Sequence, residues 1–268
     1  MRESSEHGDP SSLHGWLSEA YFGALLSGAN EQLGRRLGPR ASVDDPLFGP
    51  ATGDDIPRYL ASVATWLLAA KASFDETAFT LGADRDVTAG RLAMDRGGER
   101  VAIPVGVVAV RRPAREIVIR TYFDAGRVGG TRAVRKPLLP ADADMTVRPA
   151  VGAHLSAMDR GDVDGVVACF EIGGRVEDAA GRAYVRDSNS NSLRDYYRSL
   201  FRTPPRGVTW HKAGRADDGR TCALEYTLDG AASVNADGNP GLALYELGES
   251  GLLRSLRLYG DADTTMTA

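Results

Sequence analysis

The sequences EIVIRTYFDA at residues 116–125 and LLRSLRLYGDA at residues 252–262 contain the same pattern, Arg-x-Tyr-x-Asp-Ala. The second copy starts at Arg257, 137 positions after Arg120. Side chains alternate along a strand, so the Arg, Tyr and Asp of each copy share one face while the strand lasts. Repetition at this distance indicates two copies of one fold, and the pattern fits a shared scaffold better than a shared active site.

The residues upstream of each copy also match. The sequence YFGALLSGANEQLGRRLGPRASVDD starts at residue 21, and HLSAMDRGDVDGVVACFEIGGRVED starts at residue 154. At a constant offset of 133, Gly28 corresponds to Gly161, and Asp44-Asp45 corresponds to Glu177-Asp178. Each half is therefore predicted to hold an apolar helix that ends at a glycine, a second short helix, and a short strand that ends in two acids.

A further helix and four long strands complete each half. We expect the helices within residues 53–70 and 188–201. The strands are expected at 73–82, 86–95, 100–110 and 116–125, and again at 207–216, 221–229, 240–248 and 252–262. Because helices come first and antiparallel strands last, the chain is predicted to be a duplicated α+β protein rather than a doubly wound fold.

Three prolines, Pro137, Pro140 and Pro149, mark the boundary between the halves. The predicted organisation is a disordered tail at 1–12, a first domain at 13–136, a Pro-rich linker at 137–149, a second domain at 150–263 and a tail at 264–268. The polar start of the chain lacks the hydrophobic region of an export signal, so we expect a cytoplasmic protein.

The composition is that of a globular protein that can bury a core, since 43% of the 268 residues are hydrophobic and 25% are charged. A net charge of −4, with Lys and Arg dispersed, argues against nucleic acid or an anionic membrane as a partner. No apolar run approaches the roughly 20 residues of a membrane span. Cys169 and Cys222 lie in apolar contexts and are expected to be free, buried thiols.

The order of elements resembles the nuclear transport factor 2-like (NTF2-like) superfamily, the cystatin-like cone that includes ketosteroid isomerase, limonene epoxide hydrolase and SnoaL-like polyketide cyclases. The residues that carry the resemblance are 43–60 and 116–125 in the first half, and 175–187, 193–201 and 252–263 in the second. The resemblance implies two tandem cone-shaped α+β barrel domains, each with an apolar pocket inside a curved sheet. Because many members are homodimers packed through their sheets, the chain is expected to be a pseudo-dimer, either monomeric or weakly self-associating.

Asp45 is the first candidate for a catalytic residue, since the resemblance places a working acid after the second helix. A carboxylate at a pocket mouth can act as a general base when burial raises its pKa. The alternative for Asp44 and Asp45 is structural, because an Asp before Pro often accepts backbone N–H groups of the following turn.

His211 and Glu225 form the other candidate acid/base pair. A carboxylate beside a histidine fixes the tautomer of the ring, and the pKa of histidine lies nearest neutrality. Alternation along residues 222–228 does not settle which face of the strand Glu225 occupies. The alternative is an exposed pair on the sheet, with Trp210 as the buried member. In the sequence alignment of the halves, Arg91 corresponds to Glu225.

Side chains that could line a pocket and bind substrate are aromatic or arginine residues. They are Arg91, Arg120, Tyr122, Tyr184, Tyr245, Trp210, Trp66 and Tyr59. An arginine or tyrosine there would stabilise a developing oxyanion, whereas the aromatic residues have a simpler role as core or pocket wall. His14 and His154 have no second ligand at i+4, so no metal is predicted, and no motif implies a cofactor.

The leading hypothesis is a cofactor-independent enzyme of secondary metabolism that binds a small apolar metabolite and catalyses cyclisation, isomerisation or dehydration by proton transfer. The alternative is a ligand-binding or scaffold protein whose cones are filled by its own side chains, as the apolar run at residues 100–110 would allow. Epoxide hydrolysis is less expected, because the Asp-Arg-Asp arrangement that the resemblance would require is absent: Ala93 stands two places after Arg91.

Overall fold

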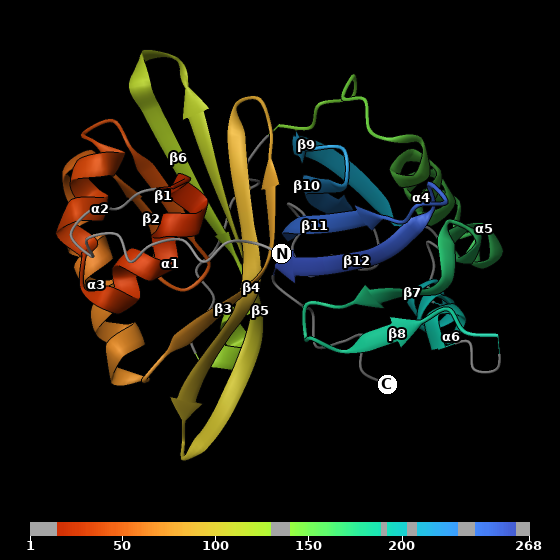
Figure 1. The fold of residues 1–268 in the computed structure, drawn as a ribbon, viewed down its shortest axis with the longest axis horizontal. Coiled ribbons are helices and arrows are strands. Elements are labelled where there is room, and N and C mark those ends of the chain that lie inside the picture. Colours follow the sequence, from red (N-terminus) through yellow and green to blue (C-terminus); the bar gives the residue numbers. More distant parts are fainter. Residues whose placement is uncertain (1–14, 130–139, 189–191, 203–207, 230–238, 261–268) are drawn as a thin grey trace.

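The structure is a computed structural model that describes residues 15–129, 140–188, 192–202, 208–229 and 239–260 (Figure 1). The elements of the first half are α1 (Leu17–Ser27), α2 (Asn30–Leu37), β1 (Ser42–Asp45), β2 (Gly49–Thr52), η1 (Gly53–Asp55), α3 (Ile56–Ala69), β3 (Ser73–Leu81), β4 (Arg85–Arg96), β5 (Glu99–Arg112), η2 (Pro113–Arg115), β6 (Glu116–Tyr122) and η3 (Ala125–Val128). The predicted tails at 1–12 and 264–268, and the predicted linker up to residue 139, lie outside the described residues.

The second half repeats this order. Its elements are α4 (Pro149–Arg160), α5 (Val163–Ala168), β7 (Phe170–Glu177), β8 (Ala183–Val185), α6 (Ser192–Leu200), β9 (Thr209–Asp217), β10 (Thr221–Asp229), β11 (Asn239–Leu247) and β12 (Leu253–Gly260). The first helix of each half ends at the predicted glycine. Gly28 and Gly161 are the C-caps of α1 and α4, with φ values of 79° and 62° that a glycine adopts without steric cost.

Each half forms one six-stranded mixed sheet. The orders are β2-β1-β6-β5-β4-β3 and β8-β7-β12-β11-β10-β9. The last four strands of each half are antiparallel, as predicted, and the short acidic strand joins the last strand in parallel. Both sheets are open, so the predicted barrels are wrong in that respect, although the duplicated α+β fold is confirmed.

Strand register shows which residues of the two halves are equivalent. Asp44 faces Arg120 in the first sheet and Glu177 faces Arg257 in the second, which confirms this part of the sequence alignment. The alignment of Arg91 with Glu225 is wrong by two residues. Gly106 faces both Tyr122 and Ala89, whereas Leu242 faces both Tyr259 and Glu225, so the equivalent of Glu225 is Ala89.

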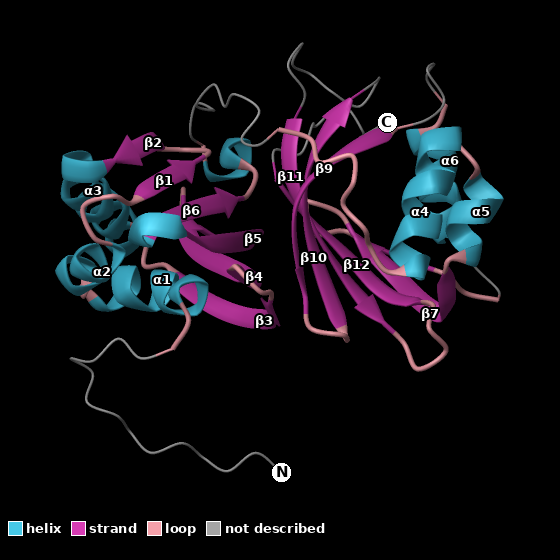
Figure 2. Ribbon diagram, turned by 90° about the horizontal axis from the view of Figure 1, so that it is seen from above, coloured by secondary structure: helices cyan, strands magenta, loops and turns pink. Residues whose placement is uncertain are grey.

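The two sheets pack against each other in the middle of the molecule, and the helices cover their outer faces (Figure 2). The inter-sheet core consists of Val87, Ala89, Val108, Val110, Val118, Tyr122, Ala216, Ala223, Leu242, Leu244 and Tyr259. The position of strand β5 between two cores explains why its sequence is almost entirely apolar. Val107 belongs to the core under the helices and Val108 to the inter-sheet core, so the strand is buried on both faces.

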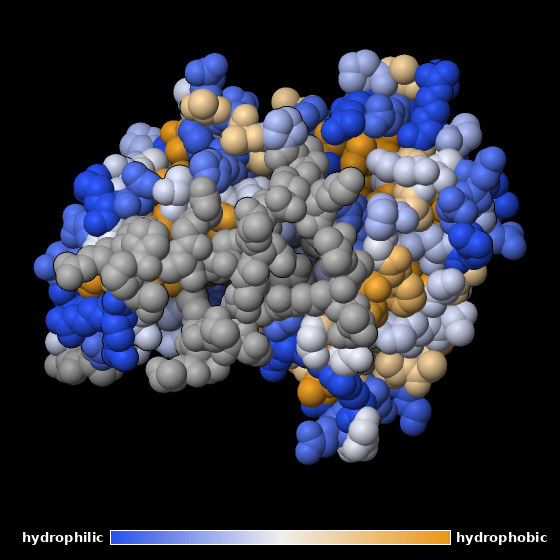
Figure 3. All heavy atoms as spheres, turned by 180° about the vertical axis from the view of Figure 1, so that it is seen from behind, coloured by the Kyte–Doolittle hydropathy of each residue, from blue (hydrophilic) through white to orange (hydrophobic). Residues whose placement is uncertain are grey.

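The outer surface is mixed in character. Seen from behind, the described part of the surface is mainly hydrophilic with scattered apolar side chains (Figure 3). The exposed large apolar residues in the described ranges are Trp16, Leu68 and Ile172. Among the described helices, none is long and apolar enough to cross a membrane.

Candidate functional site

Asp45 lies at the end of β1, buried under the helices of the first domain. Its Oδ1 accepts the backbone N–H groups of Leu47 and Phe48 at 2.8 and 2.9 Å. Its Oδ2 accepts hydrogen bonds from the hydroxyls of Thr121 and Tyr59 at 2.8 and 3.2 Å. Two of these four bonds cap the turn between β1 and β2. Asp45 therefore makes the turn-capping bonds that its structural alternative requires. Its role as a general base stays a prediction.

Tyr59 links Asp45 to the first helix, because its hydroxyl lies 2.7 Å from that of Tyr21. Burial, followed by the nearby Asp45 charge, raises the pKa of both tyrosines above the ordinary value of 10.0. Both hydroxyls therefore stay protonated at neutral pH. Phe48 packs against Tyr59 and Trp66 with ring centroids 6.2 and 5.9 Å apart, so these predicted binding residues lie in or against the core.

Asp178 is the counterpart of Asp45 in the second domain and has a similar environment. Its Oδ1 accepts the backbone N–H groups of Ala180 and Arg182, while its Oδ2 accepts from the Arg182 side chain and from Tyr184. Tyr184, a predicted binding residue, also stacks on Tyr196 with centroids 4.4 Å apart. The repeated use of this carboxylate as a turn cap supports a structural role.

The interior of the second domain contains a histidine that the sequence did not mark as functional. His154 in α4 is fully buried, with Tyr197 of α6 at 3.1 Å from its Nε2 and Tyr245 of β11 at 3.3 Å from its Nδ1. Burial lowers the pKa of His154 to about 3, so the ring is neutral near pH 7. In the sequence, the one indication that His154 faces the interior is its alignment with Tyr21, an aromatic residue of the equivalent first helix.

A cleft lined by aromatic and aliphatic side chains lies next to this histidine. Its cavity measures about 50 Å³ and is lined by Met158, Tyr196, Tyr197, Leu200, Val208, Trp210, Tyr226, Leu228, Leu256 and Leu258. Trp210 stacks on Tyr226 with ring centroids 4.0 Å apart. The Nε1 of Trp210 is buried and has no hydrogen-bond partner in the described structure. A buried donor without an acceptor is costly. Because Trp210 lines the cleft while its Nε1 is covered, a turn of the indole would bring this donor to an acceptor on a ligand.

Glu225 lies outside both domain interiors, in the middle of the inter-sheet contact. Arg120 donates two hydrogen bonds to its carboxylate at 2.6 and 2.7 Å. Tyr122 and Arg85 also donate, at 2.7 and 3.0 Å. Burial alone raises the pKa of Glu225, but Arg120 and, after it, Arg85 outweigh that effect and lower the pKa below 4.5. The four side chains join the two domains.

The predicted pairing of His211 with Glu225 is corrected by the strand register. In the β9–β10 ladder His211 faces Thr227, and Glu225 faces Gly214 because the register shifts between Glu225 and Tyr226. All of the hydrogen bonds described for the Glu225 carboxylate go to Arg120, Arg85 and Tyr122. Glu225 lies on the face of β10 that points toward the first domain, and not on the face that points into the second domain. Catalysis by His211 or Glu225 stays a prediction.

The remaining predicted binding residues fall into two groups. Tyr245 and Trp210 lie in the interior of the second domain. Arg91, Arg120 and Tyr122 lie on the inter-sheet face, where Arg91 donates to Glu177 of the other domain at 2.6 Å. In the described ranges, no group of three or more His, Cys, Asp or Glu residues is arranged to hold a metal ion.

Comparisons with solved structures find one domain at a time. An NTF2-like protein of unknown function from Cytophaga hutchinsonii is 15% identical, covers 45% of this chain and 94% of its own, and gives a TM-score of 0.34. A SnoaL-like protein of unknown function from Burkholderia thailandensis is 16% identical over 41% of this chain and 91% of its own, with a TM-score of 0.33. An epoxide hydrolase/cyclase-like enzyme of pyran ring formation in the polyether salinomycin is 18% identical over 41% and 88%, with a TM-score of 0.33.

No protein-family model matches the chain, and a search of curated proteins finds no match. The similar structures therefore concern fold and not activity. The element order and the two sheets show that the chain consists of two tandem α+β domains with the same strand order.

Proposed function

We propose that the chain binds a small, mainly apolar molecule in the cleft of the second domain. The observation that carries the proposal is the Nε1 of Trp210, a buried donor without an acceptor at a cleft that is otherwise apolar and aromatic. Ligand sites commonly combine such walls with a few polar groups that fix orientation. The bound molecule therefore needs a flat or cyclic apolar part and one neutral acceptor, such as a carbonyl oxygen.

The size of the cleft restricts how the molecule binds. A cavity of about 50 Å³ holds fewer than two waters at roughly 30 Å³ each. One end of the ligand fills this space, and the remainder lies between rim side chains that are only half buried, Leu200, Leu228 and Leu258. The sheet of the first domain covers the sheet of the second. The chain is therefore a pseudo-dimer, and we expect it to be monomeric.

Binding is better supported than catalysis by the ionisable groups at the cleft. Burial raises the pKa of Tyr196, Tyr197 and Tyr226, so they are poor acids near neutral pH. His154, behind Tyr197, has a pKa of about 3 and is a weak base. General acid–base catalysis works best when the pKa of the catalytic group lies near the operating pH.

Proton transfer, as in an isomerase or cyclase, is the second candidate function. One observation favours it: Tyr197 both lines the cleft and contacts His154, so the Tyr245–His154–Tyr197 chain of hydrogen bonds reaches the ligand site. Acetophenone in D2O tests this function by NMR, because abstraction of a methyl proton replaces it with deuterium. Exchange faster than in buffer, and lost in Tyr197→Phe, would support the function, and exchange at the buffer rate would exclude it for this probe.

The binding proposal is tested with two probes of matched shape, acetophenone and isopropylbenzene. Trp210→Phe keeps an aromatic ring but removes the N–H donor together with the five-membered part of the indole. The smaller ring affects both probes, so the hydrogen bond is read from the ratio of the two affinities. We expect the preference for acetophenone over isopropylbenzene to fall about five- to tenfold, the worth of one neutral hydrogen bond. Binding is measured by the ligand-induced rise in melting temperature and by titration.

Trp66→Phe in the first domain is the matched control, because Trp66 lies outside the cleft. This variant should bind both probes as the parent chain does. Failure of both probes to bind the parent chain would contradict the proposed function, as would equal losses in Trp66→Phe and Trp210→Phe.

A further inference from the structure

Two equivalent rows of residues cross each other at the centre of the inter-sheet contact. The first row is Tyr122–Gly106–Ala89 in the first sheet, and the second row is Tyr259–Leu242–Glu225 in the second sheet. A Cβ atom on Gly106 would lie 2.5 Å from Leu242 Cδ2, so the middles of the rows touch. At one end, the Tyr122 hydroxyl donates to Glu225 at 2.7 Å. At the other end, Tyr259 and Ala89 belong to the same buried cluster.

The rows differ in one position that decides the charge at each end. Arg120 and Tyr122 share the carboxylate of Glu225, which comes from the other domain. Arg257 and Tyr259 are their equivalents, but the first domain presents Ala89 where the second presents Glu225. In the described ranges, the carboxylate nearest to Arg257 is Glu246 of its own sheet, at 3.9 Å. Among the described residues, no carboxylate from the opposite domain lies between Arg257 and Tyr259 as Glu225 lies between Arg120 and Tyr122. The Tyr259 hydroxyl instead shares hydrogen bonds with Thr77 and Arg257.

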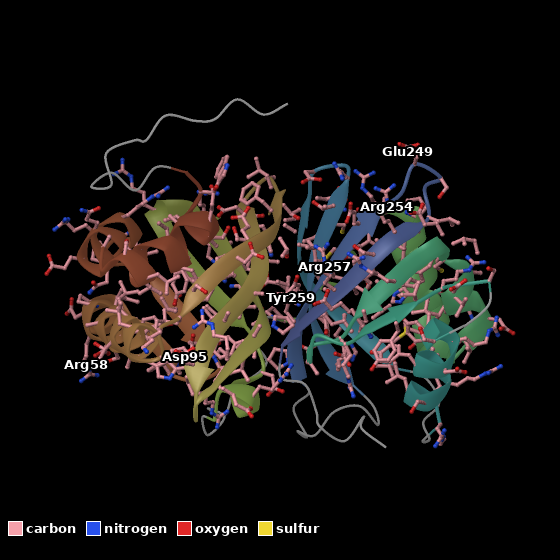
Figure 4. All side chains as sticks on the ribbon, turned by 60° about the horizontal axis from the view of Figure 1, so that its bottom comes forward. Arg58, Asp95, Glu249, Arg254, Arg257 and Tyr259 are labelled. Atoms are coloured by element: carbon pink, nitrogen blue, oxygen red, sulfur yellow. The ribbon has the colours of Figure 1, made fainter. Side chains whose placement is uncertain are left out.

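A pocket of about 160 Å³ lies at this second Arg–Tyr pair, between the two sheets. Its polar lining side chains are Thr77, Arg91, Arg175, Glu177, Arg257 and Tyr259. Figure 4 shows Arg257 and Tyr259 on β12, at the side of the second sheet that faces the first domain. Three guanidinium groups and one carboxylate give the pocket a positive charge, although the whole chain carries −4.

We propose that this pocket binds a small organic carboxylate, with its carboxylate group between Arg257 and Tyr259 as that of Glu225 lies between Arg120 and Tyr122. Guanidinium groups bind carboxylates in a bidentate manner. A volume of 160 Å³ corresponds to about five water molecules, which suits an acid of a few carbon atoms. The site is separate from the cleft of the second domain, because β12 presents Leu256 and Leu258 to the cleft and Arg257 and Tyr259 to the pocket.

The test uses the full chain with sodium acetate and sodium succinate, at an ionic strength held constant with sodium chloride. We expect both acids to raise the melting temperature and to give saturable binding by calorimetry. Arg257→Gln should weaken binding by at least about tenfold, because it removes a charged hydrogen-bond donor. Ala89→Glu should remove binding, because its own carboxylate would occupy the place.

Two further variants keep the test decisive if a buried substitution impairs folding. Arg175→Gln changes an exposed side chain of the pocket and should weaken binding about threefold. Arg58→Gln is the control, since Arg58 is exposed on the helical side of the first domain and should leave binding unchanged (Figure 4). Equal stabilisation by chloride, tighter binding of inorganic phosphate than of acetate, or equal losses in the Arg58 and Arg175 variants would overturn the proposal.

Discussion

The two domains carry different ionisable groups at two equivalent positions, one in the interior and one at the inter-sheet contact. In the first helix of each half, Tyr21 of the first domain corresponds to His154 of the second. At the contact, Ala89 corresponds to Glu225. The backbone pattern around both positions is shared, so the differences show how a duplicated fold acquires two chemical environments without changing its architecture.

The contact position should have the largest effect on stability. Glu225→Leu leaves the buried Arg120 without its carboxylate, and breaking a buried ion pair from one side costs about 3–5 kcal/mol. The loss is measured as the change in the free energy of unfolding in urea. Glu171→Gln is the control, because the Glu171–Arg254 pair lies at the surface with both side chains partly exposed, and it should cost less than about 1 kcal/mol. A loss below 1 kcal/mol in Glu225→Leu would show that the network does not stabilise the contact.

The interior position should give the second domain a pH dependence that the first lacks. Burial lowers the pKa of His154 from 6.5 to about 3 in the folded chain. The unfolded chain therefore binds more protons between these values, and stability falls as the pH is lowered through this window. From pH 6.5 to 5 the loss is about 1.6 kcal/mol, because the slope rises from half to nearly all of about 1.4 kcal/mol per pH unit as the unfolded histidine becomes protonated.

His154→Gln should remove most of this loss, although it lowers stability at neutral pH. Urea unfolding of both chains at pH 7, 6.5 and 5 measures the difference. This window lies above the range in which Glu225 titrates, since the pKa of that carboxyl is below 4.5. Equal slopes for the parent chain and His154→Gln would contradict a buried, neutral histidine.

Asp45 and Asp178 should give smaller and similar effects, because they cap equivalent turns. Asp45→Asn and Asp178→Asn each keep one acceptor oxygen and lose part of the hydrogen bonding. We expect each to cost about 1–3 kcal/mol of unfolding free energy. If Asp45→Asn left stability unchanged while it removed a measured activity, the structural role of Asp45 would be wrong and the predicted general base would gain support.

Arg91→Gln should have the smallest effect on stability. Its pair with Glu177 crosses the domain contact, but half of the Arg91 side chain is exposed. Exposed ion pairs contribute about 0–1 kcal/mol, so the unfolding free energy should fall by no more than that. A loss above 2 kcal/mol would mean that this side of the contact is as tightly coupled as the side that holds Glu225.

The sequence predicted the duplication, the element order and the equivalence of Asp44 with Glu177, because these follow from repeated glycines, acids and periodicity. It could not place Glu225. A residue on a strand that is buried on both faces shows no contrast between an inner and an outer side, so alternation alone leaves two choices. The register shift in β9 next to Glu225 adds an offset that the sequence does not reveal.

The candidate site shows the same limit in another form. The sequence left two alternatives for the strand that holds Trp210 and His211, and in the structure both side chains are partly buried, with Trp210 packed against the core of the second domain. It could not bring His154 together with Tyr197 and Tyr245, which are 43 and 91 positions away. Such contacts depend on how helices lie across a sheet, and no local pattern encodes that arrangement.

The single Glu225 also makes the two domains unequal in self-complementarity. An isologous pair of second domains, arranged about the same pseudo-twofold axis, would place each Glu225 against the Arg257 and Tyr259 of its partner and so form the ion pair twice. An isologous pair of first domains would place Ala89 against Arg120 and leave two buried guanidinium groups without a carboxylate. Fusion into one chain therefore gives the first domain a partner that a second copy of itself would not replace.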